Sequence, residues 1–124
     1  MKILIIEDEA ILGKVIQEKL KNENFETRIA VNGDEGVAQA REFMPDLILL
    51  DLILPKRNGF EVLTEIKHNP DTQLIPVIVL SNLDQEDDVK KALQLGAVDY
   101  LVKAHHPIKE VLEKVKEFVY NKSR

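Results

Sequence analysis

The sequence alternates short aliphatic runs with longer segments of helical periodicity, and this alternation restricts the chain to few folds. Three runs are almost continuously aliphatic, at residues 2–7 (KILIIE), 46–51 (DLILLD) and 76–81 (PVIVLS). Such runs are typical of parallel strands that helices cover on both faces, whereas the alternating FETRIAV of 25–31 and the short DYLV of 99–102 favour edge positions. Because helix-like segments separate the runs, we expect an α/β fold with one parallel sheet of five strands.

Five segments have the periodicity of amphipathic helices, with apolar residues at spacings of three and four. Asp34 is the expected N-cap of the second helix, Gly96 should end the fourth, and Pro107 is compatible with the first turn of the fifth. The expected helices span residues 9–22, 34–43, 59–68, 85–95 and 107–120.

Length and composition bound the remaining possibilities. The 124 residues predict a single domain, 1–124, and no aliphatic stretch approaches the roughly 20 apolar residues that a membrane span needs. The N-terminal residues also lack the long apolar region of a signal peptide, so we expect a cytoplasmic protein. The absence of cysteine excludes disulfides and thiolate metal sites, and the net charge of −5 argues against direct binding to nucleic acid.

Charged and polar residues follow four of the predicted strands at the point where each should end. They are Glu7 and Asp8 after the first strand, Asp51 after the third, Ser81 at the fourth and Lys103 after the fifth. In open parallel sheets, ligands bind beyond the carboxyl ends of the strands. We therefore expect three acids, a hydroxyl and an amine to gather at one edge of the sheet.

The three acids predict a particular chemistry. Any one of them has a simpler interpretation, since Asp51 can start the turn toward Pro55 and Glu7 with Asp8 can occupy the start of the next helix. Asp51 nevertheless interrupts an aliphatic run, and a carboxylate withdrawn from water needs a counter-charge or a cation. Three clustered carboxylates suit Mg²⁺, Mn²⁺ or Ca²⁺, and such an ion with one fixed lysine suits phosphoryl transfer onto a carboxylate.

Taken together, these positions resemble the receiver domain of two-component response regulators, over essentially the whole chain. The resemblance implies a flavodoxin-like (βα)5 fold, a three-layer sandwich whose parallel sheet has the strand order 2-1-3-4-5. It further implies a phosphoprotein that forms an aspartyl phosphate in signal transduction, and not a turnover enzyme. The Pro55 and Gly59 positions after the phosphoacceptor and the Leu95-Gly96-Ala97 lead into the last strand also match the family.

The resemblance assigns a role to each candidate site residue. Asp51 would accept the phosphoryl group from a phosphohistidine of a sensor histidine kinase or a phosphotransfer protein. Ser81 and Lys103 would bind the phosphoryl group, and Ser81 with Tyr100 would form the conformational switch. The ligands of Mg²⁺ would be Glu7, Asp8, Asp51 and the backbone carbonyl of Ile53.

Phosphorylation would change a surface formed by the fourth helix, the fifth strand and the fifth helix, roughly residues 85–120. By resemblance this surface would contact a downstream effector protein or domain, or a second copy of the chain in a homodimer. The sequence departs from the family at Ala104, where a proline is usual, and at Asn82, where a small residue is usual. Because the apolar Ile53 and Leu83 flank the site, we expect them to hinder an attacking water and prolong the life of the phosphoaspartate.

Three alternative functions have different sequence requirements. A haloacid-dehalogenase-like phosphatase would need a second acid at position 53, which is Ile53, and a nucleotide or flavin binder would need a glycine-rich loop that the chain lacks. A degenerate receiver that binds partners without phosphorylation remains an alternative because of Asn82 and Ala104. The adjacent His105 and His106 lack the spacing of a metal site.

Overall fold

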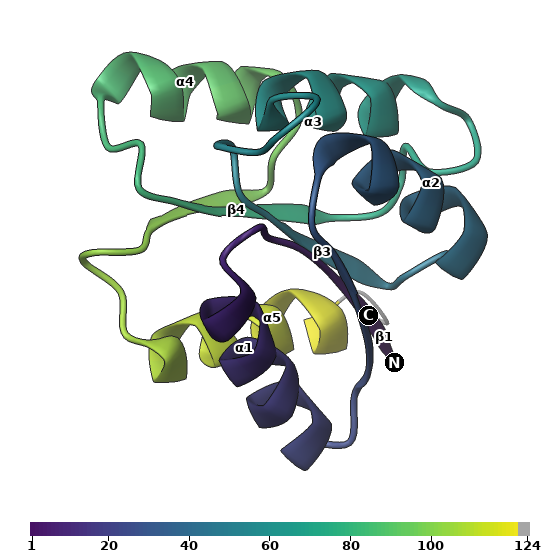
Figure 1. Ribbon diagram of the computed structural model, residues 1–124, viewed down its shortest axis with the longest axis vertical. Helices are drawn as coiled ribbons and strands as arrows, with labels where there is room; N and C mark the ends of the chain where they lie inside the picture. The colour runs from purple at the N-terminus through teal and green to yellow at the C-terminus, as the bar shows by residue number, and fades with distance from the viewer. Residues whose placement is uncertain (122–124) are drawn as a thin grey trace.

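The computed structural model describes residues 1–121, which form a five-stranded parallel sheet with helices on both faces (Figure 1). The elements alternate along the chain as β1 (Lys2–Ile6), α1 (Ala10–Asn22), β2 (Glu26–Ala30), α2 (Gly33–Phe43), β3 (Leu47–Leu50), α3 (Gly59–His68), β4 (Val77–Ser81), α4 (Glu86–Gln94), β5 (Asp99–Val102) and α5 (Ile108–Asn121). The strand order is β2-β1-β3-β4-β5, and all four pairings are parallel. The predicted flavodoxin-like three-layer fold is confirmed.

The three central strands bury both of their faces, which explains their continuous aliphatic sequences. In β1, Leu4 and Ile6 face the apolar layer that includes side chains of α2, α3 and α4, while Ile3 and Ile5 face the layer of α1 and α5. Figure 1 shows the same division, with α2, α3 and α4 on one side of the sheet and α1 and α5 on the other. The alternation follows from the two-residue period of a strand. Since both faces are filled by side chains, reactive groups have access to solvent at the strand ends.

Each helix begins within one residue of its predicted start, and two of the differences concern residues that the sequence singled out. Asp34 is not the N-cap of α2, because the side chain of Asn32 accepts a hydrogen bond from the Glu35 N–H (2.9 Å) and the helix begins at Gly33. Asp34 instead lies in the first turn, where the helix dipole favours an acid. Pro107 precedes α5 by one residue, and its carbonyl accepts the first hydrogen bonds of that helix.

The end of α4 agrees with the prediction from Gly96. This residue has φ of 113°, in the left-handed region that favours glycine, and its N–H donates to the Leu93 carbonyl at 3.1 Å. The chain then turns directly into β5, which begins at Asp99. Gly96 therefore sets the short connection that brings β5 alongside β4.

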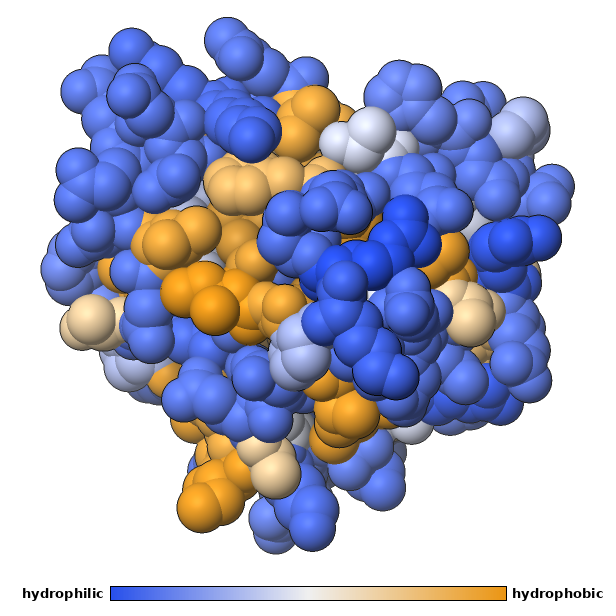
Figure 2. Space-filling model, turned by 45° about the horizontal axis from the view of Figure 1, so that its top comes forward, coloured by the Kyte–Doolittle hydropathy of each residue, from blue (hydrophilic) through white to orange (hydrophobic). Residues whose placement is uncertain are grey.

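The surface is mostly hydrophilic, with some large apolar side chains left exposed. Figure 2 shows a group of hydrophobic side chains near the centre of an otherwise largely hydrophilic face. Ile11 and Leu74 are the most exposed of the large apolar residues, at 83% and 86%. None of the helices within residues 1–121 carries an apolar stretch that would reach across a lipid bilayer.

Candidate functional site

The sheet places the predicted site residues at the carboxyl ends of its strands. Glu7, Asp51 and Lys103 each follow the last residue of a strand, and Ser81 is the last residue of β4. Backbone bonds extend the ladders to these positions, since the Asp51 N–H donates to the Ile6 carbonyl (3.0 Å) and the Lys103 N–H to the Ser81 carbonyl (2.9 Å). Their side chains therefore start from fixed backbone positions at one edge of the sheet.

The start of α3 fixes the loop that follows Asp51. A Cβ atom at Gly59 would overlap the Cα of Leu52 and would lie 2.5 Å from the carbonyl oxygen of Asp51. The Gly59 N–H donates to the Leu52 carbonyl (2.8 Å), and the side chain of Asn58 caps the helix by accepting from the Glu61 N–H (3.1 Å). Only a residue without a side chain allows this close packing, which holds the backbone of Asp51 against the helix.

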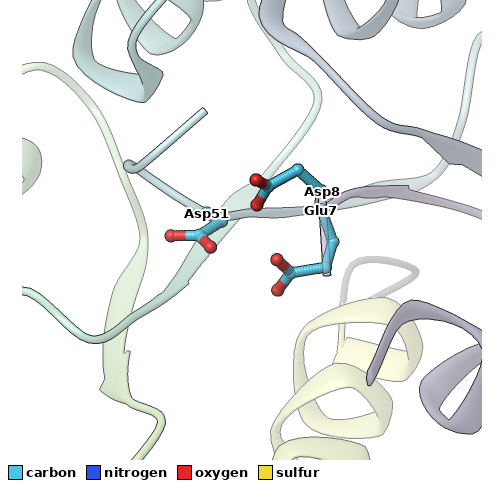
Figure 3. Close-up of side chains that lie close together, drawn as sticks. All are labelled: Glu7, Asp8 and Asp51. Carbon is cyan, nitrogen blue, oxygen red and sulfur yellow. The ribbon is translucent and has the colours of Figure 1, made fainter. Parts of the chain in front are cut away.

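Three carboxyl groups meet beyond the ends of β1 and β3. One oxygen from each of Glu7, Asp8 and Asp51 lies within 4.8 Å of the others, and Figure 3 shows Glu7 and Asp8, which follow β1, near Asp51. Glu7 and Asp51 are 3% and 4% exposed, whereas Asp8 is exposed to solvent. A cluster that offers only carboxylate oxygens suits a hard divalent cation.

Lys103 provides the positive charge of the site. Its ammonium is 2.7 Å from Glu7 Oε1, 2.8 Å from Asp51 Oδ2 and 2.5 Å from Glu9 Oε2, and its side chain is 10% exposed. Burial lowers the pKa of Lys103, but the hydrogen bonds to the three carboxylates outweigh burial and raise the pKa above its ordinary value. Lys103 is therefore a permanent cation beside Asp51.

The charged form of Glu7 is disfavoured, whereas that of Lys103 is favoured, because Glu7 is buried and one ammonium does not neutralise several carboxylates. Burial and the charge of Asp51 raise the pKa of Glu7 to about 7, and the hydrogen bond from Lys103 lowers it only in part. An ionised Glu7 is thus costly in the protein alone. A bound divalent cation favours the ionised form of such a carboxylate.

Both oxygens of Asp51 accept hydrogen bonds, so its carboxylate has a defined orientation. The Ser81 hydroxyl donates to Oδ1 at 2.8 Å and the Ile53 N–H donates to the same oxygen at 3.1 Å, while Lys103 binds Oδ2. Ser81 is fully buried. Ser81 and Lys103 thus supply the side-chain donors that contact the Asp51 carboxylate.

Tyr100 connects the hydroxyl side of the site to β5. Its hydroxyl donates to the Leu83 carbonyl at 2.6 Å, and the Leu83 N–H lies 3.4 Å from the Ser81 hydroxyl oxygen. Tyr100 is 9% exposed, so its side chain lies inward. Burial, with smaller contributions from nearby aspartates, raises the pKa of Tyr100 to about 12, which keeps its hydroxyl a donor. Asp51, Ser81, Leu83 and Tyr100 thus form one continuous chain of contacts.

Comparison with known proteins identifies the family of this chain. The sequence profile of the response regulator receiver domain matches residues 3–116. The chain belongs to the response regulator receiver family. Receiver domains of two-component response regulators are signalling domains and not turnover enzymes.

Individual relatives and solved structures agree with this assignment. The phosphate regulon transcriptional regulatory protein PhoB of Rhizobium meliloti is 35% identical over 102 residues, which are 82% of this chain and 45% of that protein. The Mn²⁺-bound form of response regulator Rcp1, a Synechocystis protein, has a TM-score of 0.80 at 36% identity and covers 94% of this chain and 92% of that one. The receiver domain of the sensor histidine kinase PA1611 of Pseudomonas aeruginosa, with magnesium coordinated in its active-site cleft, has a TM-score of 0.85 at 26% identity over 95% and 96% of the two chains.

The curated relatives of this chain include much longer proteins. The chain spans about half the length of PhoB and of the transcriptional regulatory protein ResD of Bacillus subtilis. A receiver domain in those proteins is therefore joined to further sequence.

The structure brings together the acids, the hydroxyl and the amine that the sequence placed at strand ends, and it adds one residue. Glu9, which sequence reasoning did not assign, contacts Lys103. The available signal was a third acid in the Glu7-Asp8-Glu9 run, but sequence alone did not show which way its side chain points. Among the residues that the structure describes, His105 and His106 join no group of potential metal ligands, and no peptide bond is cis, including the one into Ala104.

Proposed function

We propose that this receiver domain accepts a phosphoryl group on Asp51 from the phosphohistidine of a sensor histidine kinase or a phosphotransfer protein. The observation that carries the proposal is the setting of the Asp51 carboxylate, which is 4% exposed, adjoins two further carboxylates and is bonded by Ser81 and Lys103. A carboxylate that adjoins an acidic cation site and accepts hydrogen bonds from a hydroxyl and an ammonium suits phosphoryl transfer, which needs positioning and charge neutralisation.

The residues present fit Mg²⁺. Glu7, Asp8 and Asp51 would hold the ion together with the backbone carbonyl of Ile53, and the oxygen-only donor set and the raised pKa of Glu7 support this assignment. The metal ions in the PA1611 receiver and in Rcp1 support it further. When bound, the ion would neutralise charge on the carboxylates and on the incoming phosphoryl group.

The protein's own residues would carry the transfer. An oxygen of Asp51 attacks phosphorus, the bond from phosphorus to the donor histidine nitrogen breaks, and that nitrogen keeps the electron pair. The Ser81 hydroxyl and the Lys103 ammonium, which bind Asp51 in the unphosphorylated domain, would then bind phosphoryl oxygens. The domain catalyses only its own phosphorylation and dephosphorylation in this scheme.

The signal would pass along the contacts that begin at Ser81. Phosphorylation adds about −1.5 to −2 charge, and movement of the Ser81 hydroxyl changes its contact with Leu83 and hence the position of Tyr100. The output would be a changed surface of α4, β5 and α5 that contacts an effector protein or domain, or a second copy of the chain in a homodimer. The net charge of −5 supports an effector, and not nucleic acid, as the direct partner.

Two apolar residues support a long-lived phosphoaspartate. Ile53 is 53% exposed, and its backbone N–H is 3.1 Å from Asp51 Oδ1, so an exposed apolar residue adjoins the carboxylate that water would have to approach. Leu83 is also close to the site, since its N–H is 3.4 Å from the Ser81 hydroxyl oxygen. A phosphoryl group that is lost within seconds in the isolated protein would contradict this expectation.

The proposal also includes the extent and the location of the domain. We assign the whole chain, residues 1–124, to one receiver domain, of which residues 122–124 lie outside the described structure. A cytoplasmic location is supported by the composition and by the kind of partner that a receiver domain requires.

Binding of beryllofluoride, a mimic of the phosphoryl group, tests the function with few assumptions. We expect the wild-type protein to bind one beryllofluoride in the presence of Mg²⁺, detected by fluorine NMR, and to bind none without Mg²⁺. The Asp51→Asn variant should bind none in either condition. Failure of the wild-type protein to bind would favour a degenerate receiver that acts without phosphorylation.

A further inference from the structure

Glu9 stands at the start of α1 but does not act as a helix cap. It occupies the N-cap position with extended backbone angles (φ −76°, ψ 99°), and its side chain makes no capping hydrogen bond. Its backbone carbonyl accepts the Gly13 N–H (2.9 Å) in the usual way. The carboxylate instead points to Lys103, with 2.5 Å between Oε2 and Nζ. Helix formation therefore does not account for the position of this side chain.

The contact with Lys103 connects an exposed acid to a buried cation. The Glu9 side chain is 56% exposed and that of Lys103 is 10% exposed. The same ammonium also binds Glu7 and Asp51, which are almost fully buried. Of the three carboxylates, that of Glu9 loses least solvation and can return to water when Lys103 takes another partner.

The charge balance of the site affects how readily Lys103 can change from Glu9 to another partner. Glu7, Asp8, Glu9 and Asp51 with the single Lys103 carry a formal charge of −3 when every carboxylate is ionised. This excess attracts a cation and repels an anion, and the Glu9 charge contributes to both effects. A phosphoryl group therefore has to compete with Glu9 for the ammonium.

We propose that Glu9 is a positioning residue that holds Lys103 in the unphosphorylated domain and gives it up to the phosphoryl group. The inference rests on the proposed function and extends it to a residue outside the predicted site. It requires that removal of the Glu9 charge change the affinities for Mg²⁺ and for an anion in opposite directions. The affinity for Mg²⁺ falls, because one negative charge is lost, while the affinity for an anion at the Asp51 position rises, because Lys103 has one competitor fewer.

The opposite signs are measurable with Glu9→Gln and a matched control, Glu18→Gln, which removes the same charge from an exposed position of α1. Calorimetry gives the affinity for Mg²⁺, and fluorine NMR at saturating Mg²⁺ gives that for beryllofluoride. We expect Glu9→Gln to bind Mg²⁺ about two- to fivefold more weakly and beryllofluoride about two- to fivefold more tightly. Glu18→Gln should match the wild type in both measurements.

The ammonium signal of Lys103 provides a direct readout without any ligand. Glu9→Gln should shift the side-chain ¹⁵N and ¹H resonances of Lys103, and Glu18→Gln should leave them in place. Loss of affinity for both ligands, or no change in either, would refute the inference while the wild type still bound beryllofluoride. A wild-type protein that bound no beryllofluoride would instead refute the proposed function, and this inference with it.

Discussion

Asp8 provides a sharp test of the site, because the structure predicts that its negative charge lowers the stability of the metal-free protein. Its exposed carboxylate lies within 4.8 Å of carboxylate oxygens of Glu7 and Asp51. No ion pair found within residues 1–121 involves Asp8. Two like charges at this separation repel by about 1 kcal/mol even in bulk water. Replacement by Asn keeps the size and removes the charge.

We therefore expect Asp8→Asn to raise the free energy of unfolding of the metal-free protein by about 1 kcal/mol at low ionic strength. Mg²⁺ should reverse the ranking. At a Mg²⁺ concentration 100 times its dissociation constant, the wild type gains about 2.7 kcal/mol, and a variant that binds about tenfold more weakly gains about 1.4 kcal/mol. The advantage of the variant should therefore disappear on addition of the ion.

The assay is urea denaturation in chelator and in Mg²⁺, for the wild type, Asp8→Asn and a control, Asp71→Asn. Asp71 is exposed in the connection between α3 and β4, so its replacement should change stability by less than about 0.5 kcal/mol in both conditions. Two results would refute the reasoning: a metal-free Asp8→Asn protein less stable than the wild type, or one that gains as much from Mg²⁺ as the wild type does.

Three further predictions concern the groups around the acids. Lys103→Met leaves two buried carboxylates without their cation and should lower the free energy of unfolding in urea by about 3 kcal/mol. Lys116→Met, which breaks a partly exposed ion pair, should cost less than about 1 kcal/mol. Tyr100→Phe removes the hydrogen bond to the Leu83 carbonyl, so it should cost about 1 kcal/mol and increase amide exchange in the loop after β4; unchanged exchange would count against the contact. The pKa of Glu7 is raised from 4.5 to about 7, so the folded state binds this proton more tightly than the unfolded state does. Without Mg²⁺, the protonated Glu7 stabilises the fold fully below pH 4.5. This stabilisation, up to about 3 kcal/mol, is lost as the pH rises through about 7. Glu7→Gln should abolish that part of the pH profile, and an identical profile in the variant would contradict the assignment.

The sequence predicted the sheet well because burial on both faces leaves a strong pattern. The aliphatic runs around Ile5, Leu49 and Val79 form the central strands, and the two weaker runs form the edges. The strand order came from the family resemblance and not from periodicity. The residues at the strand ends were also predictable, since the carboxyl ends of parallel strands share one edge.

Local choices between similar residues were less predictable. Asn32 and Asp34 are both good N-cap residues, and the backbone selects the first of them, because α2 begins at Gly33. A Cβ atom at Gly33 would overlap the backbone of Arg57, so the packing of a distant loop requires glycine there. The sequence contains both candidates, but the contact that decides between them is tertiary.

Side-chain directions at the site were the hardest to predict. The inward position of Tyr100 depends on the Leu83 carbonyl, and the direction of Glu9 depends on Lys103, which lies 94 residues further along the chain. Neither dependence has a local sequence signal. The residue types of the site were thus predictable, whereas the sharing of Lys103 among three carboxylates required the structure.

Intact mass after incubation with acetyl phosphate tests the central claim most directly. The wild-type protein, the Asp51→Asn variant and the Asp8→Asn variant would each be incubated with and without Mg²⁺. We predict an adduct of one phosphoryl group on the wild type that requires Mg²⁺. Asp8→Asn should need a higher Mg²⁺ concentration to form the same adduct, and Asp51→Asn should form none. An adduct of equal size on Asp51→Asn, or none on the wild type in Mg²⁺, would contradict the central claim.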